Sequence, residues 1–294
     1  MSEGLRDNGF QEYMVLKDCP YCHDSANFAE IAASPRTVKC HTCGLYRLYP
    51  RMNRYGQTAM LKNYEDEEVD LTQWNSPLVN VINYSSIIEK TKRIFPFIFP
   101  GGRVLDVGCG EGSFVAALTQ AGANATGIEP IEKIVKFGKE YGSDLRVGRF
   151  EVGGMPSDLK KHSFDLICFL ECIYYMSDLS ETFGLINTYL KPGGGLYIKC
   201  HTPSSMYYFK DNDYSSRYGR GVAGMPTKKA LTYMLNHEGY RIHEIGYYPE
   251  NIFHTIQWIH IEEQRIGKIT GGLISPIIHA IEKGDRIGLY ASKV

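Results

Sequence analysis

Short apolar runs with strand character recur in the middle of the chain, at residues 104–107, 125–128 and 145–147. Helical patterns at residues 114–120 and 131–141 lie between these runs. Strands that alternate with helices usually form a parallel sheet with right-handed crossover connections. The pattern therefore predicts an α/β fold, with helices on both faces of a doubly wound sheet.

Further elements flank this alternation on both sides. An amphipathic helix is expected at residues 84–95, where Pro96 ends it. Towards the C-terminus, Thr227 is placed to cap a helix over 228–238, followed by strands at 240–246 and 286–292. The intervening insertion at 247–285 carries an apolar helical pattern and is longer than most connections. A substrate lid or a contact in a homo-oligomer would each explain it.

Two pairs of cysteines stand near the N-terminus, Cys19 with Cys22 and Cys40 with Cys43. Two C-x-x-C pairs at this separation are typical of a tetrahedral zinc site, so these four residues are the candidate metal ligands. Two local disulfides or a redox pair are the alternatives, and the neighbouring His23 and His41 could replace a cysteine.

A zinc ribbon is therefore expected within residues 1–50, with short strands at 28–32 and 37–39. Residues 51–83 follow as a connecting segment rich in tyrosine and acidic residues, for which a solvated linker is one interpretation. The remaining four cysteines, at positions 109, 168, 172 and 200, lie in or beside expected strands and fit a core role.

The strand at 104–107 runs into a glycine turn and then a helix, which is the form of a nucleotide-binding corner. Glycines permit close approach of a ligand to the backbone, and the N-terminus of the helix favours an anionic group. The dinucleotide fingerprint G-x-G-x-x-G is absent, because Ser113 stands where its third glycine would fall. Glu129 ends the second strand, where a carboxylate can accept hydrogen bonds from both hydroxyls of an adenosine ribose.

The run Asp106-x-Gly108-x-Gly110-x-Gly112 resembles the first motif of class I S-adenosylmethionine-dependent methyltransferases. The resemblance continues through Glu129, the strand at 164–169 and the turn into the strand at 190–198. It covers roughly residues 84–294 and implies a Rossmann-like seven-stranded sheet with an antiparallel last strand. With the ribbon at its N-terminus, the chain resembles a subgroup associated with sugar and surface-glycan biosynthesis, although His23 stands where a glycine usually follows the second cysteine.

The resemblance implies S-adenosylmethionine as cofactor. Pro130 and Ile131 are placed to flank one side of its adenine, and Arg149 and Phe150 to close the other, although core packing explains Ile131 and Phe150 equally well. The expected donor-binding residues are Asp106, Gly108, Gly110, Gly112, Glu129, Pro130, Ile131, Arg149, Phe150 and Leu170.

Catalytic residues are expected after the fourth and fifth strands, because ligands bind beyond the carboxyl ends of such strands. Methyl transfer needs the acceptor held in line with the methyl group, and a general base only for acceptors such as hydroxyls. His201 is the first candidate, with Tyr175 and Glu171 beside it. In related enzymes a histidine often stands at the position of Tyr175, and His201 could equally be a hydrogen-bonded cleft residue.

The segment at 206–222 interleaves aromatic residues with Lys210, Arg217 and Arg220. Such a composition suits stacking on a sugar or base and binding of phosphate, so the segment is expected to bind the acceptor. A solvated loop is the alternative.

The formal net charge is −1, which gives no basic field for nucleic acid. No apolar run is long enough for a membrane span, and the first residues lack the apolar part of a signal peptide, so a cytoplasmic protein is expected. The leading hypothesis is methylation of a sugar nucleotide or glycan hydroxyl. An RNA methyltransferase and a non-catalytic adaptor are the competing hypotheses.

Overall fold

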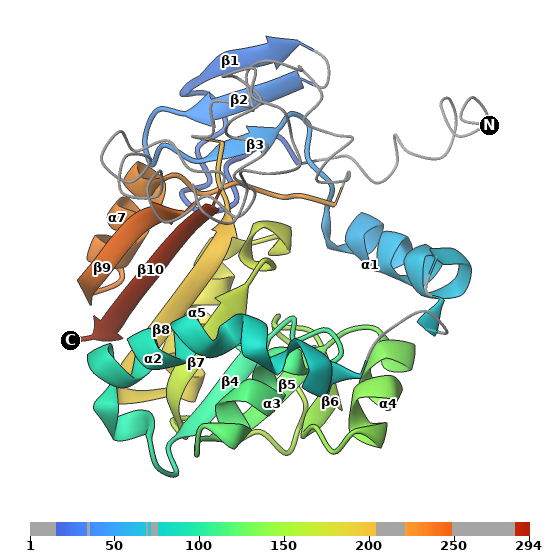
Figure 1. The fold of residues 1–294 in the computed structure, drawn as a ribbon. Coiled ribbons are helices and arrows are strands. Elements are labelled where there is room, and N and C mark those ends of the chain that lie inside the picture. The colour runs from blue at the N-terminus through green and yellow to red at the C-terminus, as the bar shows by residue number, and fades with distance from the viewer. Residues whose placement is uncertain (1–15, 34–35, 69, 72–75, 204–220, 249–285) are drawn as a thin grey trace, which may run out of the picture.

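A seven-stranded sheet forms the centre of the computed structural model, which describes residues 16–33, 36–68, 70–71, 76–203, 221–248 and 286–294 (Figure 1). Its order is β6-β5-β4-β7-β8-β10-β9. The strands are β4 (Arg103–Val107), β5 (Asn124–Glu129), β6 (Leu145–Val147), β7 (Phe164–Leu170), β8 (Leu190–His201), β9 (Tyr240–Tyr248) and β10 (Arg286–Lys293).

The strands from β6 to β8 are parallel, whereas β10 runs antiparallel to both β8 and β9. This arrangement confirms the predicted Rossmann-like class with an antiparallel last strand. Because parallel neighbours end at the same edge, the carboxyl ends of β4, β5, β7 and β8 bring distant parts of the sequence together.

Helices cover both faces of the sheet. Alternate strand residues contribute to two hydrophobic clusters, with Val104 and Leu166 in one and Leu105 and Ile167 in the other. The first cluster includes residues of α2 (Ser85–Ile94), α3 (Ser113–Gln120) and α4 (Glu132–Glu140), and the second those of α5 (Leu179–Tyr189) and α7 (Lys228–His237). The sheet is therefore buried from both sides, as expected for a parallel sheet.

Side-chain caps fix the start of the helices on the second face. The side chain of Asp178 accepts a hydrogen bond from the backbone N–H of Glu181 at 2.9 Å and so begins α5. Thr227 accepts from the N–H of Ala230 at 3.1 Å, which confirms its predicted cap on α7. Both contacts satisfy an N–H group that the helix itself leaves unpaired.

The N-terminal part forms its own antiparallel sheet of β1 (Phe28–Ala33), β2 (Arg36–Cys40) and β3 (Tyr46–Leu48). The expected short strands at 28–32 and 37–39 are thus present. Tyr21, before β1, packs edge-on against Phe183 of α5 with ring centroids 6.0 Å apart. The ribbon therefore shares a core with the larger sheet, while the domain boundaries at residues 50 and 83 stay a prediction.

Residues 51–83 contain more regular structure than their polar pattern suggests. The segment forms α1 (Arg54–Asn63), a π-helical turn (Tyr64–Glu68) and a 3₁₀ helix (Pro77–Tyr84). Asn53 caps α1 by accepting a hydrogen bond from the N–H of Gly56 at 2.9 Å. The buried residues of α1 are Gly56 and Gln57, so this helix has no apolar stripe that would reveal it in the sequence.

Two predicted segments lie wholly or mostly outside the described residues. They are the aromatic and basic segment at 206–222, except Gly221 and Val222, and residues 249–285 of the expected insertion. The described part of the chain holds no helix with the length and apolar character needed to cross a membrane.

Candidate functional site

The glycine turn after β4 has the conformation that its sequence predicts. Gly108, Gly110 and Gly112 have φ values of 66°, 54° and 85°, a region that side chains rarely adopt. A Cβ on Gly108 would lie 2.7 Å from Cβ of Cys172, whereas a Cβ on Gly110 would meet no atom within 4 Å. The backbone at Gly110 therefore borders open space at the N-terminus of α3, where a ligand can approach.

Glu129 joins this turn to the end of β5. One carboxylate oxygen accepts a hydrogen bond from the N–H of Gly110, and the other accepts from the N–H of Ile131, both at 3.2 Å. Burial raises the pKa of Glu129 to about 7, although these two hydrogen bonds act in the opposite direction. The carboxyl group is thus fixed in position at the strand end expected for ribose recognition.

Asp106 lies beneath the same turn and is almost completely buried. Its Oδ1 atom has no hydrogen-bond partner among the described residues. Burial raises the pKa of Asp106 well above its usual value, and the nearby Glu129 and Glu111 add to the shift. Three acidic groups therefore converge here, and a cationic group of a ligand would be complementary to them.

The residues expected around the adenine have mixed positions. Ile131 and Phe150 are both buried, and Phe150 packs edge-on against Phe169 of β7 with ring centroids 5.3 Å apart. Pro130 and Leu170 are partly exposed. Core packing thus accounts for much of Phe150, and contact between any of these residues and a donor stays a prediction.

Polar contacts fix the side chain of Arg149 after β6. Its Nη1 donates a hydrogen bond to Oγ1 of Thr58 at 2.8 Å, and its Nε lies 3.0 Å from a carboxylate oxygen of Glu151. Thr58 belongs to α1, so Arg149 connects the loop after β6 to that helix.

The expected catalytic residues gather at the ends of β7 and β8. Glu171 has a φ of 57°, a conformation that costs energy for a residue with a side chain, and its N–H donates to the carbonyl of Lys199 at 2.7 Å. Its carboxylate lies 2.7 Å from Nε of Arg286 and 3.6 Å from Nε2 of His201. Arg286 faces His201 across the β8–β10 pair.

Arg286 also donates a hydrogen bond to Nδ1 of His201. Burial and the charge of Arg286 lower the pKa of His201 to about 3. Because Nδ1 accepts this bond, the neutral ring carries its proton on Nε2, which faces Glu171. Arg286 was missed in the sequence, because only the strand register reveals that it lies opposite His201.

Two tyrosines complete this group. Tyr174 is buried against His201, with ring centroids 5.7 Å apart, and Tyr175 lies beside it at 4.6 Å with 39% of its surface exposed. Burial raises the pKa of Tyr175. Tyr175 therefore keeps its phenol proton near neutral pH and can donate a hydrogen bond.

Helix α1 spans this edge of the sheet. The side-chain amide of Gln57 donates to the carbonyls of Tyr175 and Gly221, at 2.8 and 2.9 Å. In the π-helical turn that follows α1, a carboxylate oxygen of Glu65 accepts from the N–H of Lys133 in α4 at 3.1 Å. The segment thus contacts the chain around Tyr175 on the expected acceptor side and the first turn of α4 on the expected donor side, a role that its sequence did not predict.

The four candidate metal ligands, Cys19, Cys22, Cys40 and Cys43, lie together in the N-terminal part of the chain. All four sulfur atoms lie within 4.8 Å of one another, and the described residues contain no other such metal-binding group. Sulfur atoms of Cys19 and Cys43 are 3.5 Å apart, as are those of Cys22 and Cys40. A tetrahedral ion with zinc–sulfur bonds of about 2.3 Å needs sulfurs about 3.8 Å apart, so the cluster has the right size for zinc.

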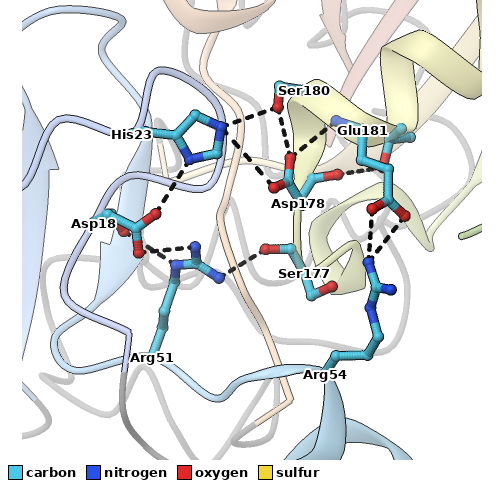
Figure 2. Close-up of polar contacts among 9 residues, drawn as sticks. Asp18, His23, Arg51, Arg54, Ser177, Asp178, Ser180 and Glu181 are labelled. Atoms are coloured by element: carbon cyan, nitrogen blue, oxygen red, sulfur yellow. Dashed lines mark hydrogen bonds and ion pairs between the residues drawn. The ribbon is translucent and has the colours of Figure 1, made fainter. Parts of the chain in front are cut away.

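A buried arginine joins the cysteine-bearing turn to the segment that precedes α5 (Figure 2). Arg51 is 1% exposed and donates to the carbonyl of Ser177 at 2.7 Å. It also donates through Nε to the carbonyl of Asp18 and through Nη2 to its carboxylate, both at 3.1 Å. Asp18 directly precedes Cys19, and Ser177 directly precedes the cap of α5.

Further contacts follow the same junction. His23 lies between Asp18 and Ser180, with ring nitrogens 3.2 and 3.0 Å from their oxygen atoms (Figure 2). Nearby, Arg54 of α1 pairs with Glu181 of α5 at 2.8 Å. The ribbon, α1 and the loop that bears Tyr175 are therefore connected through the start of α5.

Comparison with known proteins agrees with this geometry. A family model described as a methyltransferase domain matches residues 82–245. The chain belongs to this family. It thus contains an S-adenosylmethionine-dependent methyltransferase domain, and the resemblance seen in the glycine motif is confirmed at that level.

Two curated relatives are ubiquinone biosynthesis O-methyltransferases. The protein from Bordetella avium is 32% identical over 102 residues, which are 33% of this chain and 42% of the relative. The mitochondrial protein from Rattus norvegicus is 26% identical over 140 residues, or 45% of this chain and 39% of the relative. The chain thus spans about two fifths of the length of these relatives.

Solved structures show the same fold at low identity. An S-adenosylmethionine-dependent methyltransferase from Archaeoglobus fulgidus has a TM-score of 0.51 at 19% identity, covering 71% of this chain and 93% of its own. A possible sarcosine dimethylglycine methyltransferase from Galdieria sulphuraria has a TM-score of 0.53 at 14% identity, covering 78% and 98%.

Proposed function

We propose that the protein transfers a methyl group from S-adenosylmethionine to a hydroxyl oxygen of a small polar acceptor. The observation that carries the proposal is the corner formed by Gly110 and Glu129. It combines an open backbone position, a carboxyl group held by two backbone N–H groups, and the unpaired Oδ1 of Asp106.

These residues fit the donor group by group. Glu129 would accept hydrogen bonds from the ribose hydroxyls, which would stabilise its carboxylate form. Asp106 and Glu111 would favour the positive charge of the donor, and the open backbone at Gly110 would allow close approach. Pro130, Ile131, Arg149, Phe150 and Leu170 stay the expected surroundings of the adenine.

When bound, S-adenosylmethionine supplies an electrophilic methyl group on a good leaving group. The chain's own residues have to hold the acceptor oxygen in line and exclude water. Glu171, at the end of β7, would take the proton of the acceptor hydroxyl, while Tyr175 would donate a hydrogen bond to the acceptor. His201 and Arg286 would hold the carboxylate of Glu171 in place.

In this mechanism His201 is a positioning residue, and Glu171 replaces it as the candidate base. The hydrogen bond from Arg286 occupies Nδ1, and a pKa of about 3 leaves the ring a weak base at neutral pH. Nε2 carries the proton and faces Glu171, so the ring is oriented to donate to that carboxylate.

A sugar nucleotide or glycan hydroxyl remains the first candidate acceptor, because the chain with its N-terminal cysteine pairs resembles the methyltransferase subgroup associated with sugar and glycan biosynthesis. The relatives named for ubiquinone biosynthesis support transfer to oxygen and add a phenolic hydroxyl as the second candidate. Both candidates are small hydroxyl compounds, which agrees with a site built around one carboxylate and one tyrosine.

Zinc would be held by Cys19, Cys22, Cys40 and Cys43, whose sulfur spacing supports a closed tetrahedral structural site. The metal would fix the turn that carries Asp18 and thereby the contacts of Arg51 with Ser177. The role of the metal would be to stabilise this junction, which lies beside the loop that bears Tyr175.

The proposal can be tested with radiolabelled S-adenosylmethionine and a panel of phenols, catechols and nucleotide sugars. A Gly110→Ala variant places a methyl group in the open donor space, at a φ of 54° that also strains the backbone, and should lose more than about 90% of the transfer. Gly193→Ala is the matched control, because its φ of 72° imposes similar strain, its Cβ also meets no atom within 4 Å, and it lies near the start of β8, at the opposite end of the parallel strands from the corner. Equal activity of both variants would count against the donor site.

A further inference from the structure

Arg47, the middle residue of β3, is a buried charge whose guanidinium has no hydrogen-bond partner among the described residues. Arg47 is 0% exposed. Nε, Nη1 and Nη2 all lack hydrogen-bond partners among the described residues. An arginine in a folded protein usually directs these donors to carboxylates, carbonyls or water, because burial of an unpaired charge is costly.

Aromatic rings surround the guanidinium. Its central carbon lies 5.4 Å from the ring centroid of Phe28 and 5.2 Å from that of Tyr49. The two rings are 4.9 Å apart, and Arg36 lies over the ring of Tyr49 at 4.5 Å. Cation–π contacts of this kind recover only part of the lost hydration of a buried guanidinium.

The strand register places these groups on one face of the ribbon. Glu30, Val38 and Arg47 lie opposite one another across β1, β2 and β3. Phe28, Arg36 and Tyr49 are each two residues away from one of these positions and therefore share the same face. The face thus combines two guanidinium groups with two partly exposed rings.

Nearby carboxylates are already committed to other groups. Glu30 pairs with Arg36 at 2.7 Å. Asp24 accepts hydrogen bonds from the N–H groups of Ala26 and Asn27, at 3.0 and 2.9 Å. The charge of Arg47 contributes, after these hydrogen bonds, to a lowered pKa of Asp24, but no carboxylate of the described residues forms a hydrogen bond with the Arg47 guanidinium.

We propose that this face of the ribbon binds an anionic group, a phosphate or a carboxylate, through the guanidinium of Arg47. The planar fork of arginine matches both anions with two parallel hydrogen bonds. Arg36, whose pair with Glu30 is exposed, offers a second guanidinium, and the rings of Phe28 and Tyr49 form apolar walls that weaken competition from water.

The site is separate from the donor corner but connected to the larger sheet. Tyr46, the neighbour of Arg47, exchanges backbone hydrogen bonds with Met225 at 2.7 and 3.2 Å. An anion at Arg47 would therefore act on a strand that is fixed to the segment before α7. The proposal does not depend on the identity of the methyl acceptor.

Calorimetric titration of the full-length, zinc-loaded protein with inorganic phosphate, and separately with acetate, tests the site. Saturation with S-adenosylhomocysteine would block anion binding at the N-terminus of α3. A second titration without S-adenosylhomocysteine shows how much anion binds there. Sodium chloride at equal ionic strength controls for screening. Wild-type protein should bind at least one of the two anions, and the preferred anion identifies the ligand class.

Arg47→Met should weaken this binding at least about tenfold, because it removes the charge and the donors but keeps an unbranched side chain. Arg36→Met, which keeps Arg47, should weaken it less. If Arg47→Met does not fold, Arg47→Lys serves instead, since it keeps the charge but loses the fork and should weaken binding several-fold. Absence of binding to both anions by the wild type, or unchanged binding by the folded Arg47 variant, would overturn the proposal.

Discussion

Arg286 donates a hydrogen bond from Nη1 to Nδ1 of His201, across the antiparallel pair of β10 and β8. The same guanidinium holds the carboxylate of Glu171 at 2.7 Å. His201 and Glu171, which are both candidate catalytic residues from the sequence, thus have different electrostatic surroundings. His201 is a neutral ring whose side chain is 19% exposed, whereas Glu171 is a carboxylate that is 30% exposed just after the end of its strand.

The low pKa of His201 gives stability a defined dependence on pH. In the unfolded chain the ring takes up a proton below about pH 6.5, whereas in the folded protein it stays neutral down to about pH 3. Protonation therefore favours the unfolded state, and the contribution is present above pH 6.5 and lost as the pH falls. Allowing for partial solvation, we expect the free energy of unfolding to fall by about 1–2 kcal/mol between pH 7 and pH 5 through this residue.

Urea denaturation of the wild type and His201→Gln at the two pH values measures that contribution. The variant should show a smaller loss of stability on acidification. His243→Gln is the control, because His243 is exposed, with its ring 2.9 Å from the hydroxyl of Ser292 and edge-on to Phe95 at a centroid distance of 5.6 Å. An identical pH dependence of all three proteins would show that His201 is not held neutral.

The two arginines of the ribbon junction should differ in their contribution to stability. Arg51→Met removes a buried guanidinium together with its hydrogen bonds to Ser177 and Asp18, which should lower the free energy of unfolding by about 2–4 kcal/mol. Arg54→Met breaks a pair in which the arginine side chain is 38% exposed, and should cost less than about 1 kcal/mol. Chemical denaturation of both variants measures the difference, and equal costs would contradict the junction as described.

Metal removal tests the ribbon. Treatment with a strong chelator, or a Cys43→Ser substitution, should lower the melting temperature by more than about 10 °C, because structural zinc supplies much of the folding energy of such small modules. Cys200→Ala is the control, since Cys200 is buried in β8 outside the cluster. A metal analysis that finds no zinc in the wild type, with no effect of the chelator, would refute the zinc assignment.

The parts of the site that could be predicted are those encoded locally. The glycines at 108, 110 and 112 and the glutamate at 129 belong to one strand–turn–helix unit and the next strand, so spacing alone reveals their relation. The four cysteines can likewise be recognised in the sequence, because the spacing within and between the two C-x-x-C pairs reflects the geometry of a bound metal ion.

The remaining parts depend on tertiary structure. Arg286 reaches His201 only through the register of β10, and α1 is buried through Gly56 and Gln57 rather than through an apolar stripe. Arg47 reads as an ordinary polar strand residue until the rings of Phe28 and Tyr49 are seen around it.

The most direct test of the donor site uses the pKa of Glu129. Ribose recognition needs the carboxylate, but burial raises the pKa of this group to about 7 in the absence of ligand. Binding must therefore release a proton at low pH, and affinity for S-adenosylhomocysteine should fall about tenfold between pH 8 and pH 6.

Calorimetric titration of the wild type and Glu129→Gln with S-adenosylhomocysteine, at pH 8 and pH 6 and in two buffers of different ionisation enthalpy, measures both effects. We predict pH-dependent binding with proton release by the wild type, and weaker binding without either effect by the variant. Tight binding by Glu129→Gln with unchanged pH dependence would contradict the assignment of the donor site to this corner.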